Sequence, residues 1–132
     1  MEEKEIVITG FARTPMGSFQ GCLSTESATS LGSVAIKGAL CKADIKGENV
    51  DDVIMGCVLP AGLGQAPARQ SAIGAGIPNS AGATTINKMC GSGMRAAMIA
   101  NDQLIAGSSK VSIAGGIESM SNTPYVLPKV RT

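Results

Sequence analysis

Hydrophobic residues occur in two kinds of segment along the chain. Short apolar runs rich in β-branched residues alternate with longer stretches in which small and apolar residues recur at helical spacing. The short runs predict strands, and the longer stretches predict helices. The predicted strands cover residues 6–9, 53–58, 83–86 and 111–114, and the predicted helices cover residues 27–43, a short stretch from 67, and residues 91–106.

The alternation of strand and helix predicts the α/β fold class. Such an order forms a mostly parallel sheet through right-handed βαβ crossovers, with helices covering the faces of the sheet. The run Val53-Ile54-Met55 has no polar alternation, which predicts a strand buried on both faces. In a sheet of this kind, functional residues gather at the carboxyl ends of the strands.

Local signals predict where the helices begin and end. Ser24 or Thr25 stands in the N-cap position of the first helix, and Gly47 stands where that helix is expected to stop. Pro67 suits the first position of the second helix. The third helix is apolar on nearly every side, so we expect its outer face to be covered by a further layer or by a second copy in a dimer.

Composition and charge narrow the classes of function. Hydrophobic residues make up 44% of the 132 residues, charged residues make up 16%, and the formal net charge is +1. The charges are scattered and only three residues are aromatic, so neither a phosphate-binding surface nor a base-stacking platform is predicted. No apolar run approaches the ~20 residues of a membrane helix, and the acidic start is unlike a secretory or organellar leader. These features predict a cytoplasmic protein that binds neither nucleic acid nor membrane.

The four cysteines are widely spaced, and the sequence contains no histidine. This spacing lacks the tight ligand clusters of a zinc site, so no metal is expected. The apolar composition also makes a disulfide scaffold unnecessary, and free thiols are therefore predicted. Cys41 and Cys57 fall at ordinary core positions, while Cys22 falls in a loop without an activating neighbour.

Cys90 differs from the other cysteines because it stands on the turn from the third strand into the third helix. The unpaired amides and the dipole of a helix N-terminus favour negative charge, which biases a thiol there toward the nucleophilic thiolate. Gly91 and Gly93 keep bulk away from the sulfur, as an acyl thioester requires. Cys90 is therefore the candidate catalytic nucleophile, and an inert buried cysteine is the alternative.

The same turn permits a second interpretation. The run Gly91-Ser92-Gly93-Met94-Arg95-Ala96 fits a dinucleotide-binding glycine pattern, and Glu118 at the end of the next strand supplies an acidic residue. Against this interpretation, the pattern lies in the third βα unit rather than the first. Glu118 also lies later than the usual offset of about 20 residues.

Several further strings occur along the chain: Gly10-Phe11-Ala12-Arg13-Thr14-Pro15-Met16-Gly17, Val53-Ile54-Met55-Gly56, Val58-Leu59, Ala61-Gly62-Leu63-Gly64-Gln65, Pro67-Ala68-Arg69-Gln70, Asn87-Lys88-Met89-Cys90-Gly91-Ser92-Gly93-Met94 and Ala114-Gly115-Gly116-Ile117-Glu118-Ser119-Met120-Ser121. At these residues the chain closely resembles the thiolase family. The resemblance covers nearly the whole length and rests on several separated strings in the same order. The continuation through Tyr125 is similar to that of the mitochondrial-type acetoacetyl-CoA thiolases.

The resemblance implies a fold and an activity. Residues 1–118 would be a thiolase-like N-terminal α/β domain, an incomplete half of a five-layer αβαβα fold, and residues 119–132 would start a loop region. Cys90 would accept the acyl group, with its backbone N–H helping to hold the thioester oxygen. The enzyme would be of the acetyl-CoA C-acetyltransferase or 3-ketoacyl-CoA thiolase type, forming or cleaving acetoacetyl-CoA. Its substrates would be coenzyme A thioesters, with no further cofactor.

The resemblance also implies partners and a limitation. The parent enzyme would be a homodimer or homotetramer, and Gln65, Arg69 and Asn87 fall in segments that approach the dimer interface in the family, without a catalytic role. Thiolases take an activating histidine and a second, acid/base cysteine from their carboxyl-terminal half. Because this sequence has no histidine, we expect the 132-residue polypeptide alone to be inactive. A non-catalytic half that pairs with another polypeptide and the dinucleotide-binding module remain as alternatives.

Overall fold

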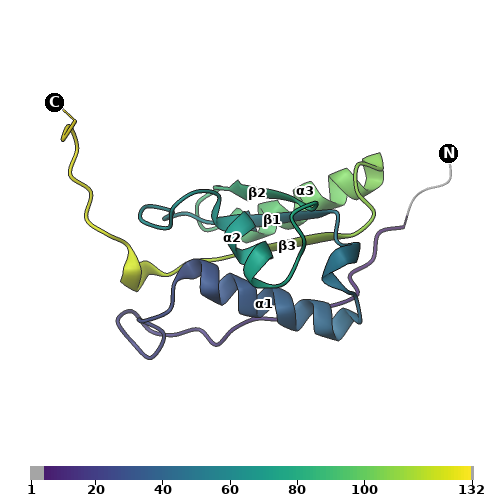
Figure 1. The fold of residues 1–132 in the computed structure, drawn as a ribbon, viewed down its shortest axis with the longest axis horizontal. Coiled ribbons are helices and arrows are strands. Elements are labelled where there is room, and N and C mark those ends of the chain that lie inside the picture. The colour runs from purple at the N-terminus through teal and green to yellow at the C-terminus, as the bar shows by residue number, and fades with distance from the viewer. Residues whose placement is uncertain (1–4, 132) are drawn as a thin grey trace.

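The computed structural model describes residues 5–131, in which helices flank a three-stranded sheet (Figure 1). Helices and strands alternate as the hydrophobic pattern predicts, and most predicted ranges agree with the observed ones within about two residues. In chain order the elements are α1 (Ala28–Ala43), the 3₁₀ helix η1 (Gly47–Asn49), β1 (Asp52–Gly56), α2 (Pro67–Gly74), β2 (Gly82–Ile86), α3 (Ser92–Ala106), β3 (Ser112–Gly116) and the 3₁₀ helix η2 (Met120–Asn122).

The sheet is parallel, with strand order β2-β1-β3. The central strand β1 is the most apolar of the three, and Val53, Ile54 and Met55 are each at most 2% exposed. This burial confirms the prediction of a strand covered on both faces. The α/β class and the mostly parallel sheet are confirmed as well.

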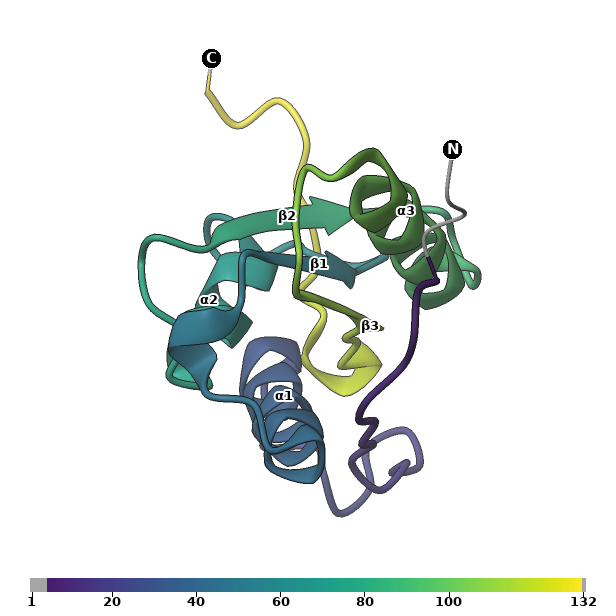
Figure 2. The ribbon, with the colours of Figure 1, turned by 90° about the vertical axis from the view of Figure 1, so that its right-hand side faces the viewer.

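Successive side chains of β1 supply the two sides of the core. Val53 and Met55 join the cluster that includes residues of α1 and α2, whereas Ile54 packs against Ala96 and Ala100 of α3. Figure 2 shows the resulting layers, with α1 and α2 on one side of the sheet and α3 on the other. Within residues 5–131, no helix combines the length and the hydropathy that a membrane crossing requires.

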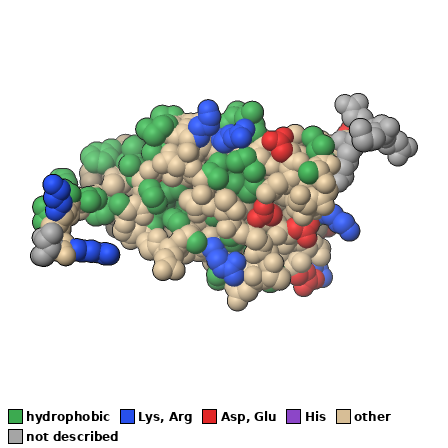
Figure 3. Space-filling model, turned by 90° about the horizontal axis from the view of Figure 1, so that it is seen from above, with side chains coloured by type: hydrophobic (Ala, Val, Ile, Leu, Met, Phe, Trp, Pro, Cys, Tyr) green, Lys and Arg blue, Asp and Glu red, His purple; other side chains and the backbone are tan. Residues whose placement is uncertain are grey.

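The outer face of α3 is exposed in this chain. Met94, Met98 and Ile105 have exposed fractions of 71%, 52% and 55%. Figure 3 views the molecule from the α3 side of the sheet and shows hydrophobic side chains spread over that surface. The helix is thus apolar on both sides, as the sequence indicates, but only its inner side is covered by the described residues.

The prediction of a strand at residues 6–9 is wrong. These residues belong to no strand, and Val7 and Ile8 are 65% and 88% exposed. A groove of about 520 Å³ lies between residues 6–12 and the free edge of β3, so the two backbones do not pair. The segment lies close against α1 at Gly10. A Cβ at this position would lie only 2.5 Å from the carbonyl oxygen of Ala39, so the close approach requires glycine.

The predicted ends of the first helix are also wrong. The N-cap is Ser27, whose Oγ accepts a hydrogen bond from the backbone N–H of Ser30 at 3.0 Å, and neither Ser24 nor Thr25 has this role. At the other end the chain leaves α1 through Asp44 in the left-handed region, with φ of 52°. Gly47 starts η1 instead of ending α1. Asp can adopt this conformation because its short polar side chain tolerates it.

The three strands finish at one level. Gly56, the last residue of β1, stands opposite Ile86 of β2 and opposite Gly116 of β3. The segments that follow the strands therefore emerge side by side at one edge of the sheet. This is the edge at which parallel sheets carry their ligands.

Asp51 lies at the opposite end of the strands, directly before β1, and its carboxylate binds the segment that precedes β3. These contacts predict how the stability of the fold responds to acid. The Oδ2 of Asp51 accepts hydrogen bonds from the backbone N–H groups of Lys110 and Val111, at 2.7 and 3.0 Å. These bonds, with Lys110 first, lower the pKa of Asp51 below its ordinary value of 3.8. A lowered pKa in the folded state stabilises the protein above the unfolded value and loses this effect as the pH falls below it.

We therefore expect Asp51→Asn to be less stable than the wild type at neutral pH, with a difference that shrinks once the pH falls below 3.8. Urea denaturation at neutral and at acidic pH measures this difference. Asp102→Asn, at an exposed position on α3, is the matched control. A difference independent of pH would contradict the assignment.

Candidate active site

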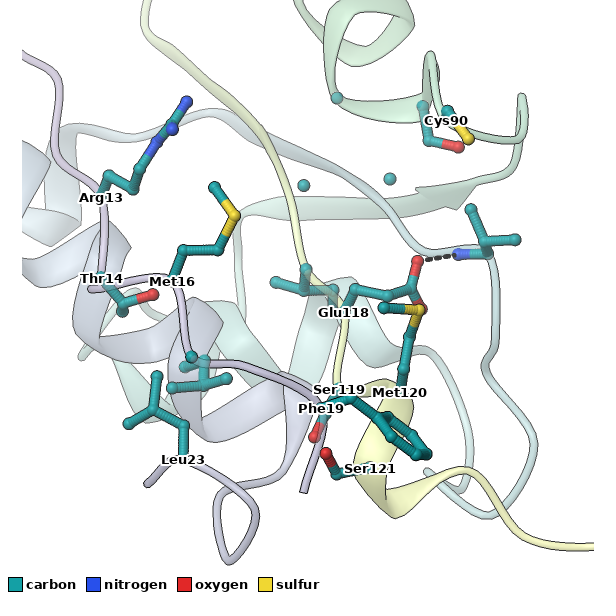
Figure 4. A pocket seen from close by; sticks show the side chains of 18 of the residues that line it. Arg13, Thr14, Met16, Phe19, Leu23, Cys90, Glu118, Ser119, Met120 and Ser121 are labelled. Carbon is teal, nitrogen blue, oxygen red and sulfur yellow. Dashed lines mark hydrogen bonds between the residues drawn. The ribbon is translucent and has the colours of Figure 1, made fainter. Parts of the chain in front are cut away.

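A cavity of about 460 Å³ lies at the carboxyl ends of the three strands (Figure 4). Four parts of the chain form most of its wall: residues 13–19, the exit of β1 at Gly56 and Val58, the turn 89–93, and residues 116–121. Figure 4 shows Arg13 and Met16 on one side of this space and Cys90 on the other. The cavity thus collects the thiol, a guanidinium group and the carboxylate of Glu118.

Cys90 lies where the sequence places it, between the end of β2 and the start of α3. It precedes Gly91, the N-cap of α3, and its side chain is exposed and lines the cavity. The first backbone N–H groups of a helix lack intrahelical partners and carry partial positive charge. The arrangement therefore presents a thiol to a ligand beside groups that favour negative charge.

Hydrogen bonds fix the conformation of this turn. Met89 has a φ of 48°, a left-handed conformation that is uncommon for a residue with a side chain. Ser92 accepts a hydrogen bond from the N–H of Lys88 at 2.8 Å and donates its hydroxyl to the carbonyl of Met89 at 2.7 Å. Asn87 accepts a bond from the N–H of Met89 at 2.9 Å. The side chains on either side of Cys90 thus hold the backbone that presents it.

Close packing of backbones holds α3 onto the sheet at the same place. A Cβ at Gly56 would lie 2.4 Å from the Cβ of Ser92, so only glycine fits at the end of β1. Gly93 and Gly116 pack against each other at ordinary contact distance, since a Cβ at Gly116 would lie 3.5 Å from the Cα of Gly93. The contact that requires glycine is therefore the one at Gly56, where the end of β1 meets the first turn of α3.

Glu118 emerges from the end of β3 and binds the segment that follows β1. Its Oε2 accepts a hydrogen bond from the N–H of Val58, and its Oε1 accepts one from the N–H of Leu59, each at 3.0 Å. The thiol of Cys57 lies 3.7 Å from the same Oε1. The carboxylate thus joins the exits of two neighbouring strands along the cavity wall.

Cys57 is the buried thiol of the chain, at 1% exposure, as its predicted core position requires. Burial, followed by the nearby charge of Glu118, raises the pKa of Cys57 above its ordinary value. Cys57 is therefore held as a neutral thiol and is a poor nucleophile. The prediction for Cys41 is wrong, because that side chain is exposed near the end of α1, whereas Cys22 is exposed in a loop and all four thiols are free.

The residues expected near a subunit interface make internal hydrogen bonds. Arg69 donates to the carbonyl oxygens of Asn79 and Ala81, at 3.1 and 3.3 Å. Gln65 offers its carbonyl to the side chain of Gln70 at 2.8 Å. These bonds tie α2 to the segments before and after it, and neither Gln65 nor Arg69 lies in the cavity wall.

Sequence reasoning missed three features of the site. Residues 13–19 form one wall of the cavity, but the sequence marks residues 13–17 only through the resemblance and does not mark residues 18 and 19. Nothing in the sequence marks Ser92 as a residue that holds the turn, and outside the family string Glu118 is predicted only as part of a nucleotide site. The usable signal for Glu118 was its position directly after a predicted strand. No group of three or more His, Cys, Asp and Glu side chains suited to a metal ion occurs within residues 5–131.

Comparison with known proteins decides the family. Residues 6–132 match the family model described as thiolase, N-terminal domain. The chain belongs to the thiolase family. The resemblance read from the motifs is thereby confirmed.

Relatives within this family are similar over nearly the whole chain. It is 56% identical over 125 residues to the mitochondrial acetyl-CoA acetyltransferase of Danio rerio, with 95% of this chain and 30% of that protein covered. It is 53% identical over 126 residues to the cytosolic acetyl-CoA acetyltransferase ERG10 of Gibberella zeae, with 96% and 32% covered. The chain therefore spans about a third of the length of these relatives.

A solved thiolase has the same fold as this chain. The structure of the Acat5 thiolase from Ascaris suum, in complex with coenzyme A, superposes with a TM-score of 0.91 at 39% identity. The match covers 92% of this chain and 32% of that one. Membership of the thiolase family accounts for the glycine pattern around Cys90 without a dinucleotide.

Proposed function

We propose that this chain supplies the nucleophile of a thiolase-type acyltransferase that forms or cleaves acetoacetyl-CoA or a related 3-ketoacyl-CoA. The observation that carries the proposal is the position of Cys90, exposed at the N-terminus of α3 in a cavity at the carboxyl ends of three parallel strands. Similarity to acetyl-CoA acetyltransferases supports the acetyl group as the acyl unit.

The proposed first step is transfer of an acyl group to the thiol. The sulfur of Cys90, as thiolate, attacks the carbonyl carbon of an acyl-CoA, and the coenzyme A thiolate leaves as the new thioester forms. The backbone N–H of Cys90 is proposed to stabilise the oxygen that becomes negative during the attack. In the condensing direction the α-carbon of a second acetyl-CoA, after losing a proton, displaces the sulfur and releases acetoacetyl-CoA. Thiolysis is the reverse.

Both steps need a group that moves a proton, and the described residues supply it poorly. The sequence has no histidine. Glu118, the acidic side chain in the cavity wall, already accepts two backbone N–H groups. General acid–base catalysis contributes about 10²–10⁴-fold to such reactions. We therefore propose that residues outside this segment complete the reaction in the parent enzyme.

Several accompanying features belong to the same proposal. Coenzyme A enters as part of the substrate, and the reaction as written requires no metal or redox cofactor. The exposed apolar side chains of α3, Met94, Met98 and Ile105, support a further layer over that face, as in a five-layer αβαβα enzyme. We propose a homodimer or homotetramer in the cytoplasm; the relatives include both cytosolic and mitochondrial proteins.

Experiments on the purified 132-residue polypeptide test whether this chain supplies the nucleophile but not the groups that transfer protons. We expect acetyl-CoA to acetylate Cys90 slowly, and we expect no steady-state cleavage of acetoacetyl-CoA by added coenzyme A. Peptide mass spectrometry locates the acetyl group, and loss of acetoacetyl-CoA absorbance measures turnover. Appreciable turnover would show that the proton-transfer groups lie within the chain, whereas absence of acetylation at Cys90 would refute the assigned nucleophile.

A further inference from the structure

Three hydrogen bonds connect the end of β3 with the turn that carries the nucleophile. Glu118 accepts the N–H of Val58 at 3.0 Å, and the carbonyl of Val58 accepts the side-chain amide of Asn87 at 3.3 Å. The amide oxygen of Asn87 accepts the N–H of Met89 at 2.9 Å. Met89 directly precedes Cys90 and has the strained left-handed conformation of the turn. The path therefore ends at the residue whose backbone orients the thiol.

The path crosses all three strand exits. Glu118 follows β3, Val58 follows β1 and Asn87 follows β2. Within the strands, ladder hydrogen bonds keep the backbones in register, but these ladders end with Gly56, Ile86 and Gly116. Beyond that level the side chains of Glu118 and Asn87 take over the connection.

The chemistry at the end of β3 requires a carboxylate. Two backbone N–H groups, those of Val58 and Leu59, point at the two different oxygens of Glu118. A carboxylate has two acceptor atoms, whereas an amide has one acceptor and one donor. Because both oxygens already accept hydrogen bonds, the arrangement suits holding a backbone more than exchanging protons with a substrate.

We propose that Glu118 is a positioning residue for the nucleophile: through the Val58 peptide and Asn87, it fixes the Met89–Cys90 turn in the geometry that accepts an acyl group. This inference rests on the proposed function of Cys90 as the acyl acceptor. The hydrogen-bond path itself is independent of that function and is tested separately below.

The test is a double-mutant cycle in the full-length protein, with Glu118→Gln, Asn87→Ala and the combination. The rate of acetyl transfer from acetyl-CoA to Cys90 is measured by peptide mass spectrometry. Each single variant is expected to lower this rate about 10- to 100-fold, the effect of a small displacement of a reacting group. Because both variants interrupt one path, the combined variant is expected to be no slower than the slower single one. Glu48→Gln, the same change at a carboxylate in η1, is the matched control and should react as the wild type.

A second readout distinguishes the path from a general loosening of the fold. Cys57 is protected by burial and by Glu118, so its alkylation by iodoacetamide is expected to rise in Glu118→Gln and to stay at the wild-type level in Asn87→Ala. Hydrogen exchange of the Met89 amide is expected to rise in both variants. Asn87 is exposed, so its variant keeps the fold and carries the test if Glu118→Gln does not fold.

Three results would overturn the inference: a wild-type acetylation rate in either single variant, multiplicative effects in the combined variant, or unchanged exchange of the Met89 amide. Failure of the proposed function is recognisable by a different result. In that case the wild-type protein is not acetylated at Cys90 at all, while the Met89 amide and the Cys57 thiol still report whether the path exists.

Discussion

Cys90→Ser is expected to abolish formation of the acyl-enzyme. A serine hydroxyl at the same turn is far less acidic than a thiol, and no histidine in this sequence can activate it. The rate of acetyl transfer from acetyl-CoA should fall by roughly 10⁴-fold or more, in line with the loss of a covalent nucleophile in other enzymes. Peptide mass spectrometry after incubation with acetyl-CoA measures the effect in the full-length protein.

The same experiment has an internal comparison. Cys41→Ser removes an exposed thiol on α1, well away from the cavity wall, and should leave acetylation of Cys90 unchanged. Thermal unfolding of Cys90→Ser should match that of the wild type, because the side chain is exposed. Acetylation of Cys22 or Cys41 at the rate seen for Cys90 would contradict the assignment, because it would show that the Cys90 thiol reacts only because it is exposed to solvent.

Gly56→Ala is expected to damage both the fold and the site. Its Cβ would lie 2.4 Å from the Cβ of Ser92, 2.6 Å from the carbonyl carbon of Ser92 and 2.9 Å from the N of Gly93. Two of these atoms are backbone, so relief requires a shift of the first turn of α3. Overpacking of this kind costs about 1–3 kcal/mol of unfolding free energy. The shift also moves Cys90, and acetylation should slow with it.

Denaturant unfolding measures the change in free energy, and Gly93→Ala provides the stability control. A Cβ at Gly93 would meet its nearest neighbour, the N of Gly116, at an ordinary contact distance of 3.6 Å. Alanine is also the better helix former, so this variant should be as stable as the wild type or slightly more stable. Equal stability of the Gly56 and Gly93 variants would contradict the packing argument.

The sequence predicts the core of this fold well because burial on two faces leaves a clear signal. Val53, Ile54 and Met55 form an uninterrupted apolar run, and that run is the central strand. The run at residues 6–9 carries a similar signal, but a strand also needs a partner, and the backbone of β3 lies across a groove from it. Hydrophobic periodicity detects apolar segments, but it does not reveal whether a segment pairs with the edge strand of a sheet.

The candidate site likewise has one part that the sequence predicts and one part that it does not. The position of Cys90 on a strand-to-helix turn follows from local glycines and from the apolar helix beyond them. The role of Glu118 does not, because its partners are the backbone N–H groups of Val58 and Leu59, far away in the sequence. Every residue except proline has such a group, so no side-chain pattern marks the two that a carboxylate will bind.

The central place of β1 has a consequence for synthesis of the protein. β1 leaves the ribosome before β2 and well before β3, yet it lies between them in the sheet. Until residue 116 has emerged, β1 lacks its β3 neighbour along one edge, and until residue 106 has emerged α3 does not cover Ile54. Nascent chains with such uncovered segments are prone to aggregation. During translation β1 is therefore the segment of this chain that a chaperone is best placed to bind.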